Sequence, residues 1–477
     1  MSTIDRNTSN YLYQQVTGFI SDQILAGVLR PGDRLPSLRH LSKRLSISVP
    51  TVRQAYVELE RQGRVESRPQ SGFYVRQQAR NALMKPASCR NCKPAPVRCR
   101  SLIDRVYEGI HTPGVVPFGI ANPSMAKPAA KGLNRAMKRI MGRAEERSIG
   151  YAPSDGEPAL RRQIAYRYLE LGGRVEPDEV VVTNGGQEAL TLALMAVAEK
   201  GDVIAVETPT YHGALELIES LGMLALEIET CPEEGLMLCS LQDAIRRHDI
   251  KACLFASSLN NPLGSATPDE HRQELVALLE AHDIPLIEDD VYGDLMFDGS
   301  RPSPARFYSD KGLVLTAGSF SKTVAPGYRV GWLLAGRFEQ RVRTLKRAFS
   351  CSCGLLQQMT LSEYLASGEY DRHIRALRPV LKCNAERMAA LIGQHFPQET
   401  RVSRPQGGSV LWLELPRTVD GGRLFDRALE ENISTCPGML YSPTRRYRNF
   451  MRLSFGHPWS DEIEAAIHRL GQMVTSD

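Results

Sequence analysis

The first 76 residues combine three helical stretches with two short strand-like ones. Apolar positions at helical spacing run from residue 11 to residue 26, where Gly27 ends the pattern. A short helix is predicted after Ser37, a good N-cap, and a further helix after Ser48. The buried face of that third helix should consist of Val52, Ala55, Tyr56 and Leu59.

Two strand-like segments, 64–68 and 72–76, follow the third helix and flank the turn residues Pro69-Gln70-Ser71. Three helices and a β-hairpin in this order predict a winged helix-turn-helix. In that arrangement the exposed face of the third helix enters the major groove of DNA, and the hairpin, or wing, lies along the phosphate backbone. Any three-helix bundle gives similar periodicity, so the prediction depends on the wing and on charge.

Beyond about residue 178, apolar strands alternate with amphipathic helices. This order predicts a large, mostly parallel sheet with helices on both faces. Ligands of such sheets gather at the carboxyl ends of the strands. The predicted strands are Glu179–Thr183, Val203–Val206, Ala252–Ala256, Pro285–Glu288, Leu313–Thr316 and Val330–Leu334.

Charge separates these two parts of the chain. The 477 residues are 42% hydrophobic and 24% charged, without a membrane-length apolar run or a signal-like segment in residues 1–10, so we expect a cytoplasmic protein. Although the net charge is only +5, residues 1–100 hold 17 basic and 6 acidic side chains, leaving 42 and 48 for the rest. A basic first fifth on an acidic body favours a nucleic-acid-binding head over a plain solvated extension.

Residues 11–76 resemble the GntR family of bacterial regulators through Pro31-Gly32-Asp33-Arg34-Leu35-Pro36-Ser37, Thr51-Val52-Arg53 and the wing that contains Gly72. The resemblance implies that Arg39, Arg53 and the wing tip contact DNA. Val49 departs from the pattern, because many members carry an arginine there, so the operator cannot be inferred from relatives. The predicted contacts to double-stranded operator DNA are Arg34, Ser37, Arg39, Thr51, Arg53, Gln70, Ser71 and Gly72.

A linker is predicted over residues 77–105, which contain prolines and polar residues without periodicity. Residues 81–100 contain basic but no acidic side chains, so this part of the linker could also lie against the phosphate backbone. Cys89 and Cys92 form a C-x-x-C pair with Cys99 nearby, but a fourth zinc ligand is missing, which favours reduced thiols over a metal or redox site. We expect the ten cysteines to be reduced and mostly buried.

The strongest chemical motif is Gly318-Ser319-Phe320-Ser321-Lys322, which continues to Arg329 and Trp332. Lys322 follows a predicted strand, with a hydroxyl three residues before it and an arginine seven residues after it. Pyridoxal 5′-phosphate (PLP) requires an amine, with which it forms a Schiff base, and receptors for its phosphate. We therefore predict that Lys322 carries PLP and that Ser319, Ser321 and Arg329 bind it.

Candidate partners for PLP follow one another along the chain. The glycine turn Gly185-Gly186-Gln187, between a strand and a helix, can bind phosphate through backbone N–H groups. Tyr211 could stack on the ring, and Asn261 would donate to the ring hydroxyl. Asp289 would keep the ring nitrogen protonated, which makes PLP an electron sink, and Tyr292 would donate to the ring oxygen. Each assignment is weak alone and depends on the whole series.

Residues 106–477 resemble the fold-type I aminotransferases of the aspartate aminotransferase superfamily through these motifs. The resemblance implies a large sheet domain joined to a smaller α+β domain. It implies that Tyr151 reaches the phosphate of the neighbouring subunit and that Arg452 clamps the α-carboxylate of a ligand. The alternative for Arg452 is a surface arginine on an edge strand.

Head and body together resemble the MocR subfamily of GntR regulators over nearly the whole chain. The resemblance implies a homodimer in which the head of one subunit packs across the body of the other. We expect a transcription regulator in which PLP, or an amine that exchanges with Lys322, alters how the heads hold the operator. Two alternatives stay open: a working aminotransferase with a DNA-binding head, and a plain DNA-binding dimer with a relic PLP fold.

Overall fold

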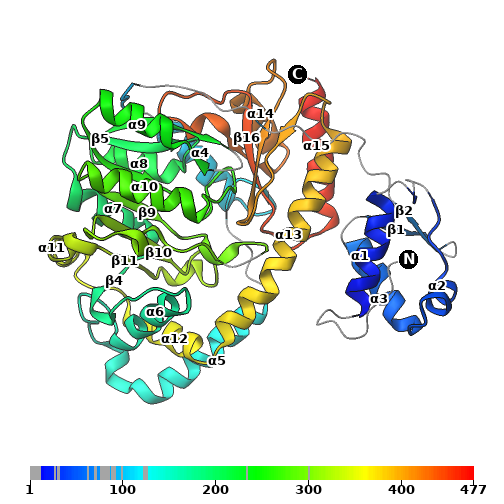
Figure 1. Cartoon of the computed structure of the whole chain (residues 1–477), viewed down its shortest axis with the longest axis horizontal. Coiled ribbons are helices and arrows are strands. Elements are labelled where there is room, and N and C mark those ends of the chain that lie inside the picture. Colours follow the sequence, from blue (N-terminus) through cyan, green and yellow to red (C-terminus); the bar gives the residue numbers. More distant parts are fainter. Residues whose placement is uncertain are drawn as a thin grey trace.

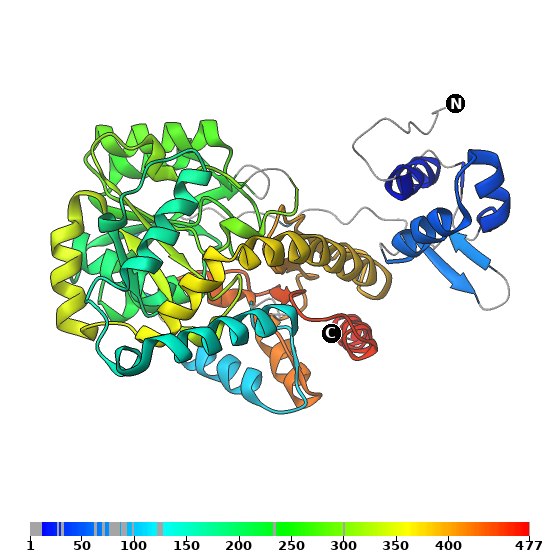
Figure 2. The same ribbon diagram turned by 90° about the horizontal axis from the view of Figure 1, so that it is seen from below.

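The protein is described here by a computed structural model that covers residues 12–25, 28–29, 33–61, 64–68, 72–75, 86, 93–97, 100–121, 127–231, 235–298 and 301–476. A small head lies beside a much larger body (Figures 1 and 2). The predicted features Gln70, Ser71, Cys89, Cys92, Cys99 and most of the linker fall outside the described residues. None of the described helices is long and apolar enough to cross a membrane.

The head has the predicted three helices and hairpin, namely α1 (Leu12–Leu25), α2 (Leu38–Leu45), α3 (Val49–Arg61), β1 (Val65–Arg68) and β2 (Gly72–Val75). The hydroxyl oxygen of Ser37 accepts the N–H of His40, and that of Ser48 accepts the N–H of Thr51, so both predicted N-caps are confirmed. β1 and β2 pair antiparallel. The predicted buried face of α3 is also confirmed: Val52, Ala55, Tyr56 and Leu59.

An eight-stranded sheet forms the centre of the larger domain. Its strands in spatial order are β4 (Val180–Thr183), β11 (Gly331–Leu334), β10 (Val314–Ser319), β9 (Leu286–Asp289), β8 (Ile250–Phe255), β5 (Val203–Thr208), β6 (Leu224–Cys231) and β7 (Gly235–Leu236). The run from β10 to β6 is parallel, whereas β11 is antiparallel to both its neighbours and β7 to β6. The six predicted strands are present, and β6 and β7 were not predicted.

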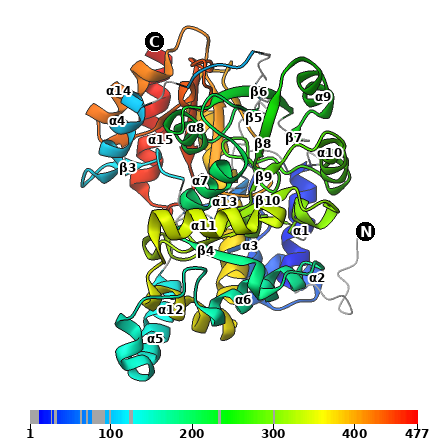
Figure 3. The same ribbon diagram turned by 90° about the vertical axis from the view of Figure 1, so that its left-hand side faces the viewer.

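Helices cover both faces of this sheet, as predicted (Figure 3). One face packs against α7 (Gly186–Val197), α8 (His212–Ser220) and α11 (Glu339–Ser350) through one apolar cluster. The other face packs against α9 (Leu238–Arg247) and α10 (Asp269–Ala281) through a second cluster. Beyond the β4 end of the sheet lie α5 (Lys127–Ala144), α6 (Pro158–Glu170) and α12 (Leu355–Ala366).

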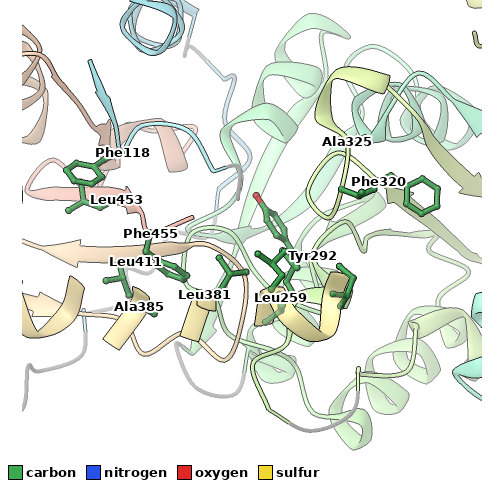
Figure 4. Close-up of a cluster of buried hydrophobic side chains, with 14 of the residues drawn as sticks. Phe118, Leu259, Tyr292, Phe320, Ala325, Leu381, Ala385, Leu411, Leu453 and Phe455 are labelled. Atoms are coloured by element: carbon green, nitrogen blue, oxygen red, sulfur yellow. The ribbon is translucent and has the colours of Figure 1, made fainter. Parts of the chain in front are cut away.

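A smaller domain contains the antiparallel sheet β12 (Arg401–Val402), β13 (Val410–Glu414), β16 (Phe450–Ser454) and β15 (Cys436–Pro437), with α14 (Gly421–Glu430) and α15 (Asp461–Ser476). A two-stranded parallel pair, β3 (Val116–Pro117) and β14 (Ile433–Ser434), adjoins it. The 27-residue helix α13 (Glu369–His395) runs from the larger domain along the smaller one (Figure 1). Figure 4 shows that the apolar core is continuous between the two domains, since Leu411 and Phe455 lie in the same cluster as Leu259 and Tyr292.

The last part of the predicted linker packs against the body. Ala95 pairs with Ala225 of β6, and Val97 is buried beside Ile103 of α4 (Arg100–His111). The body therefore begins before residue 106, the predicted boundary. The head also contacts α13, where the Cys383 thiol donates to the carbonyl oxygen of Arg61 at 2.8 Å.

The prediction that most cysteines are buried is wrong for the described part of the chain. Of its seven free cysteines, Cys253, Cys353 and Cys436 are buried, Cys231 and Cys383 are half-buried, and Cys239 and Cys351 are exposed. The described residues contain no group of three or more His, Cys, Asp or Glu side chains that could hold a metal ion.

Candidate functional site

A cavity opens at the carboxyl edge of the large sheet, where β9 and β10 end and α7 begins. Lys322, in the turn after β10, extends into it. Ten of the twelve predicted cofactor residues line this cavity: Gly186, Gln187, Tyr211, Asn261, Asp289, Tyr292, Ser319, Ser321, Lys322 and Arg329. Apolar and small residues carry no chemical signature, so the sequence did not predict the remaining lining residues, Leu190, Ala256, Leu259, Val291 and Pro326.

The amine of Lys322 is held by a backbone group that no motif could indicate. Its Nζ atom donates to the carbonyl oxygen of Ala121 at 3.1 Å, and the Tyr292 hydroxyl donates to the same oxygen at 3.3 Å. The Nζ atom also lies 6.0 Å from the centre of the Tyr292 ring. Lys322 and Tyr292 therefore share one acceptor.

The surroundings of Lys322 favour its neutral, nucleophilic form. Burial lowers the pKa of Lys322 to about 8, the positive charges of Arg452 and Arg329 act in the same direction, and Asp289 opposes them. A lysine with this pKa holds a far larger share of neutral amine near neutral pH than an exposed one.

Asp289 stands at the end of β9 and lines the cavity. Burial raises the pKa of Asp289 to about 6, although the N–H of Val291 donates to its carboxylate at 3.3 Å. The next residue, Asp290, instead forms an ion pair with Arg301. Of the two neighbouring aspartates, Asp289 is therefore the one available to a ligand. A protonated ring nitrogen beside it would favour the ionised form of its carboxylate.

The other end of the cavity is built to receive an anion. Gly185 has φ +80° immediately before the N-terminus of α7, and a Cβ atom there would lie 2.4 Å from the guanidinium of Arg329. Arg329 donates to the Ser321 hydroxyl at 3.1 Å and to the carbonyl oxygen of Asn184 at 3.2 Å. Backbone donors at a helix N-terminus, a guanidinium and hydroxyls are the groups that phosphate requires, so the residues present fit the phosphate of PLP.

Hydrogen bonds position two further predicted residues that line the cavity. Gln187 donates through Nε2 to the carbonyl oxygen of Gly213 at 3.1 Å. Asn261 accepts a 3.5 Å hydrogen bond from Arg452 through its amide oxygen. Tyr211 lines the wall at the start of α8 and packs 4.8 Å from the ring of His212.

Arg452 is not a surface residue on an edge strand, because β16 lies between β13 and β15 and Arg452 is 1% exposed. Its guanidinium donates to the carbonyl oxygen of Gly119 and lies over the ring of Tyr441 at 5.6 Å. Its Nε atom is buried without a hydrogen-bond partner among the described residues. A buried guanidinium with an unused donor is suited to receive a carboxylate from outside the chain.

Tyr151 lies outside the cavity of its own chain and is 90% exposed. Large apolar side chains nearby in the sequence, Met141 and Ile149, are exposed as well. The predicted contact of Tyr151 is with the phosphate site of a neighbouring subunit, and it stays a prediction.

Most of the predicted DNA-contacting residues that the structure describes are exposed. Arg34, Arg39 and Arg53 are exposed, as is Gly72, whereas Thr51 is half-buried and shares a 2.7 Å hydrogen bond with the Ser48 hydroxyl. The hydroxyl oxygen of Ser37 is engaged as an N-cap.

The wing is fixed to the helices through the segment before α2. Leu35 and Phe73, and Asp33 and Val75, are joined by backbone hydrogen bonds of 2.8 Å. The Tyr56 hydroxyl of α3 donates to the carbonyl oxygen of Pro36 at 2.7 Å. Hydrogen bonds to the same short segment before α2 therefore connect α3 with the wing strand β2.

Known proteins resemble this chain along almost its whole length. The model of the GntR family of bacterial regulatory proteins matches residues 12–75, and that of aminotransferase class I and II matches residues 114–470. YdcR of Escherichia coli, an uncharacterised HTH-type transcriptional regulator, is 36% identical over 97% of this chain and 98% of its own. The 2-aminoadipate transaminase of Thermus thermophilus is 30% identical over 78% of this chain and 94% of its own.

The body also resembles a solved structure in its fold. The α-aminoadipate aminotransferase LysN of Thermus thermophilus, complexed with N-(5′-phosphopyridoxyl)-L-leucine, superposes with a TM-score of 0.72 at 29% identity, over 80% of this chain and 96% of that one. The similarity covers the aminotransferase-like part, while the head is matched by the regulators.

Proposed function

This chain belongs to the MocR-type regulators, in which a GntR DNA-binding domain is fused to an aminotransferase class I and II domain, and on that premise we propose that PLP bound at Lys322 controls how the protein holds its operator. Regulators with GntR heads bind operator DNA, and aminotransferases of this class use PLP. The observation that carries the proposal is the cavity itself, which combines a low-pKa lysine, a carboxylate and an anion receptor.

Each group in the cavity has a role toward PLP that follows from its chemistry. Arg329, Ser321 and the N-terminus of α7 would hold the phosphate. Asp289 would hold a proton on the ring nitrogen, and Asn261 and Tyr292 would orient the ring oxygen. When bound, PLP supplies an aldehyde that reacts with amines and a ring that withdraws electrons. An amino-acid effector would place its carboxylate on Arg452, whose Nε atom is unused.

The proposed unit is a homodimer that completes the site with Tyr151 of a second copy. Its support is the exposure of Met141, Ile149 and Tyr151 within one short stretch of the sequence, because exposed large apolar side chains that gather in one region favour an interaction surface. In this dimer the head of one subunit would pack across the body of the other. PLP, or an amine bound to it, would then change how two heads are spaced on DNA, provided that it binds the two arrangements with different affinity.

The direct test compares apoprotein and PLP-loaded protein on genomic sites bound by this chain. We expect the PLP-loaded dimer, with or without an added amino acid, to give a different operator affinity or a different footprint length. Identical affinities and footprints across all states would refute sensing. They would leave DNA binding by the head in place.

A second candidate function is catalysis of transamination, and two observations favour testing it. The pKa of Lys322 is lowered to about 8, and Arg452 has a donor available for a substrate carboxylate. Incubation of the loaded protein with pairs of amino and keto acids decides between the two. Turnover near the usual enzyme value of about ten per second would indicate an enzyme, whereas sensing requires binding only.

Arg53 provides a prediction for the head. We expect Arg53→Ala to weaken binding to a mapped operator by about 1–3 kcal/mol and to relax base preference at one position, because Arg53 lies on the exposed face of α3. Arg61→Ala is the matched control, since that arginine pairs with Glu58 at the end of α3. Unchanged affinity and base preference in Arg53→Ala, measured by band shift on operator variants, would remove Arg53 from the DNA contacts.

A further inference from the structure

A second cluster of reactive side chains lies behind the phosphate end of the cavity. Lys346 of α11 is 1% exposed, and its Nζ atom donates to Glu188 at 2.8 Å and to the Cys353 sulfur at 3.1 Å. Cys353 is itself 5% exposed. A buried amine is thus held in contact with a buried thiol, next to a carboxylate that can accept or return a proton.

The cluster supports the turn that would hold phosphate. Glu188 lies in the first turn of α7, and its carboxylate accepts the N–H of Asn184. The carbonyl oxygen of Asn184 accepts a hydrogen bond from Arg329. The Cys353 thiol donates to the carbonyl oxygen of Val182 on β4 at 3.6 Å. A change at Cys353 or Lys346 is therefore passed directly to the β4–α7 turn.

Residues close to Cys353 in the chain lie at the protein surface. Cys351 and Gly354 are exposed on either side of Cys353, and Cys351 holds φ +58°, a left-handed conformation that side chains rarely adopt. Burial raises the pKa of the Cys353 thiol, while Lys346 opposes that effect. Oxidation of Cys353 should accordingly become faster as pH rises, since the thiolate is the reactive form.

We propose that Cys353 and Lys346 form an oxidation-dependent sulfur–nitrogen cross-link that loosens the grip of this regulator on the cofactor phosphate. In the first step hydrogen peroxide is the oxidant: an S–O bond forms, the O–O bond breaks, and the leaving hydroxide takes the thiol proton to become water. In the second step Lys346 passes one proton through Glu188 to solvent, and its neutral amine attacks the sulfur of the sulfenic acid. The S–O bond breaks as the S–N bond forms, and hydroxide leaves as water with the proton released by the nitrogen.

The consequence for PLP rests on the proposed function, but the cross-link does not. Once its nitrogen is bound to sulfur, Lys346 loses the positive charge that pairs with Glu188, and the carboxylate keeps the Asn184 N–H but loses its charged partner. Glu188 is then held less firmly, and so are Asn184 and Arg329, which are connected to it by hydrogen bonds. Because charge-assisted hydrogen bonds are among the strong ones, we expect PLP affinity to fall about tenfold after oxidation and to recover after reduction with a thiol.

The test is a peroxide titration of full-length protein, followed by mass spectrometry of the intact chain and of tryptic peptides. We expect a loss of two hydrogen atoms, with the peptide that ends at Arg347 joined to the peptide that contains Cys353. The link should be absent from Cys353→Ser and from Lys346→Arg, which keeps the ion pair with Glu188. It should persist in Cys351→Ser and be reversed by thiol.

Two results would overturn the cross-link. One is disappearance of the two-hydrogen loss in Cys351→Ser, because a disulfide between Cys351 and Cys353 has the same mass. The other is addition of oxygen to Cys353 without any joined peptide. A confirmed cross-link with unchanged PLP affinity would refute the effect on the phosphate site, and a protein that never binds PLP, oxidised or reduced, would refute the proposed function instead.

Discussion

Replacement of Lys322 by alanine is expected to leave a protein that holds PLP only reversibly and whose operator binding no longer responds to it. The aldehyde of PLP needs an amine, and Lys322 is the lysine that lines the cavity. The visible absorbance of the bound cofactor should therefore be absent, and dialysis should remove PLP from the variant but not from the wild type. DNA binding by the head should persist, since the head folds around its own core.

The same residue predicts a pH dependence. With a pKa of about 8, the Lys322 amine becomes neutral as pH rises through that value. The rate at which PLP attaches to wild-type apoprotein should rise with pH and level off above about 8, rather than climb toward the ordinary lysine value near 10.4. Lys311→Ala, at an exposed lysine, should match the wild type in absorbance and pH profile. An unaltered visible band in Lys322→Ala would exclude Lys322 as the attachment point.

Replacement of Asp294 by alanine is expected to destabilise the body by about 3–5 kcal/mol, the cost of leaving buried charges without their partner. Asp294 is buried, and its carboxylate binds Arg167 at 3.0 Å, Arg301 at 2.5 Å and the Tyr370 hydroxyl at 2.5 Å. The Arg301 side chain is largely buried, and among the described residues Asp290 is its remaining ion-pair partner once Asp294 is removed. The measurement is the free energy of the first unfolding transition in urea.

The sign of the pH effect at Asp294 follows from its environment. Burial alone would raise the pKa of Asp294, but the neighbouring charges of Arg167 and Arg301 outweigh it and hold the pKa well below its ordinary value. A carboxyl with a depressed folded pKa contributes its full stabilisation above its unfolded pKa and loses it progressively as pH falls from that value toward the folded pKa. The deficit of Asp294→Ala should therefore be constant from about pH 6 to pH 8. Asp298→Ala, which removes an exposed partner of Lys382, is the matched control and should cost about 0–1 kcal/mol. Equal losses in the two variants would contradict the buried-network account.

Much of the fold could be predicted because local patterns and tertiary structure agree. The apolar face of α3 and both N-caps of the head follow directly from residue type and spacing. The strands that carry the cavity are buried on both faces and read as short apolar runs. By contrast, β6 was missed, because Glu227 and Glu229 interrupt its apolar pattern, although Glu227 is buried and accepts the Thr208 hydroxyl.

The parts of the site that consist of reactive or charged side chains could be predicted from the sequence. Lys322, Asp289 and Arg329 have residue types that signal their chemistry, and they line one cavity. The carbonyl oxygens of Ala121 and Gly119, which receive Lys322 and Arg452, could not be predicted, since every residue has one. The pairing of Lys346 with Cys353 was equally hidden, because it depends on how a turn after α11 folds back beneath β4.

Tyr151 is exposed in the single chain, and its proposed role in the site of a second copy makes cofactor binding depend on how much of this protein the cell contains. If each proposed phosphate site takes a hydroxyl from a second copy, the concentration of complete sites follows the square of the chain concentration at low abundance, and the fraction of chains with a complete site falls on dilution. Dilution alone would then release the cofactor, with no change in its level. The amount of this protein would in this way set the threshold at which the coenzyme is detected, so its copy number and the coenzyme supply would act together rather than separately.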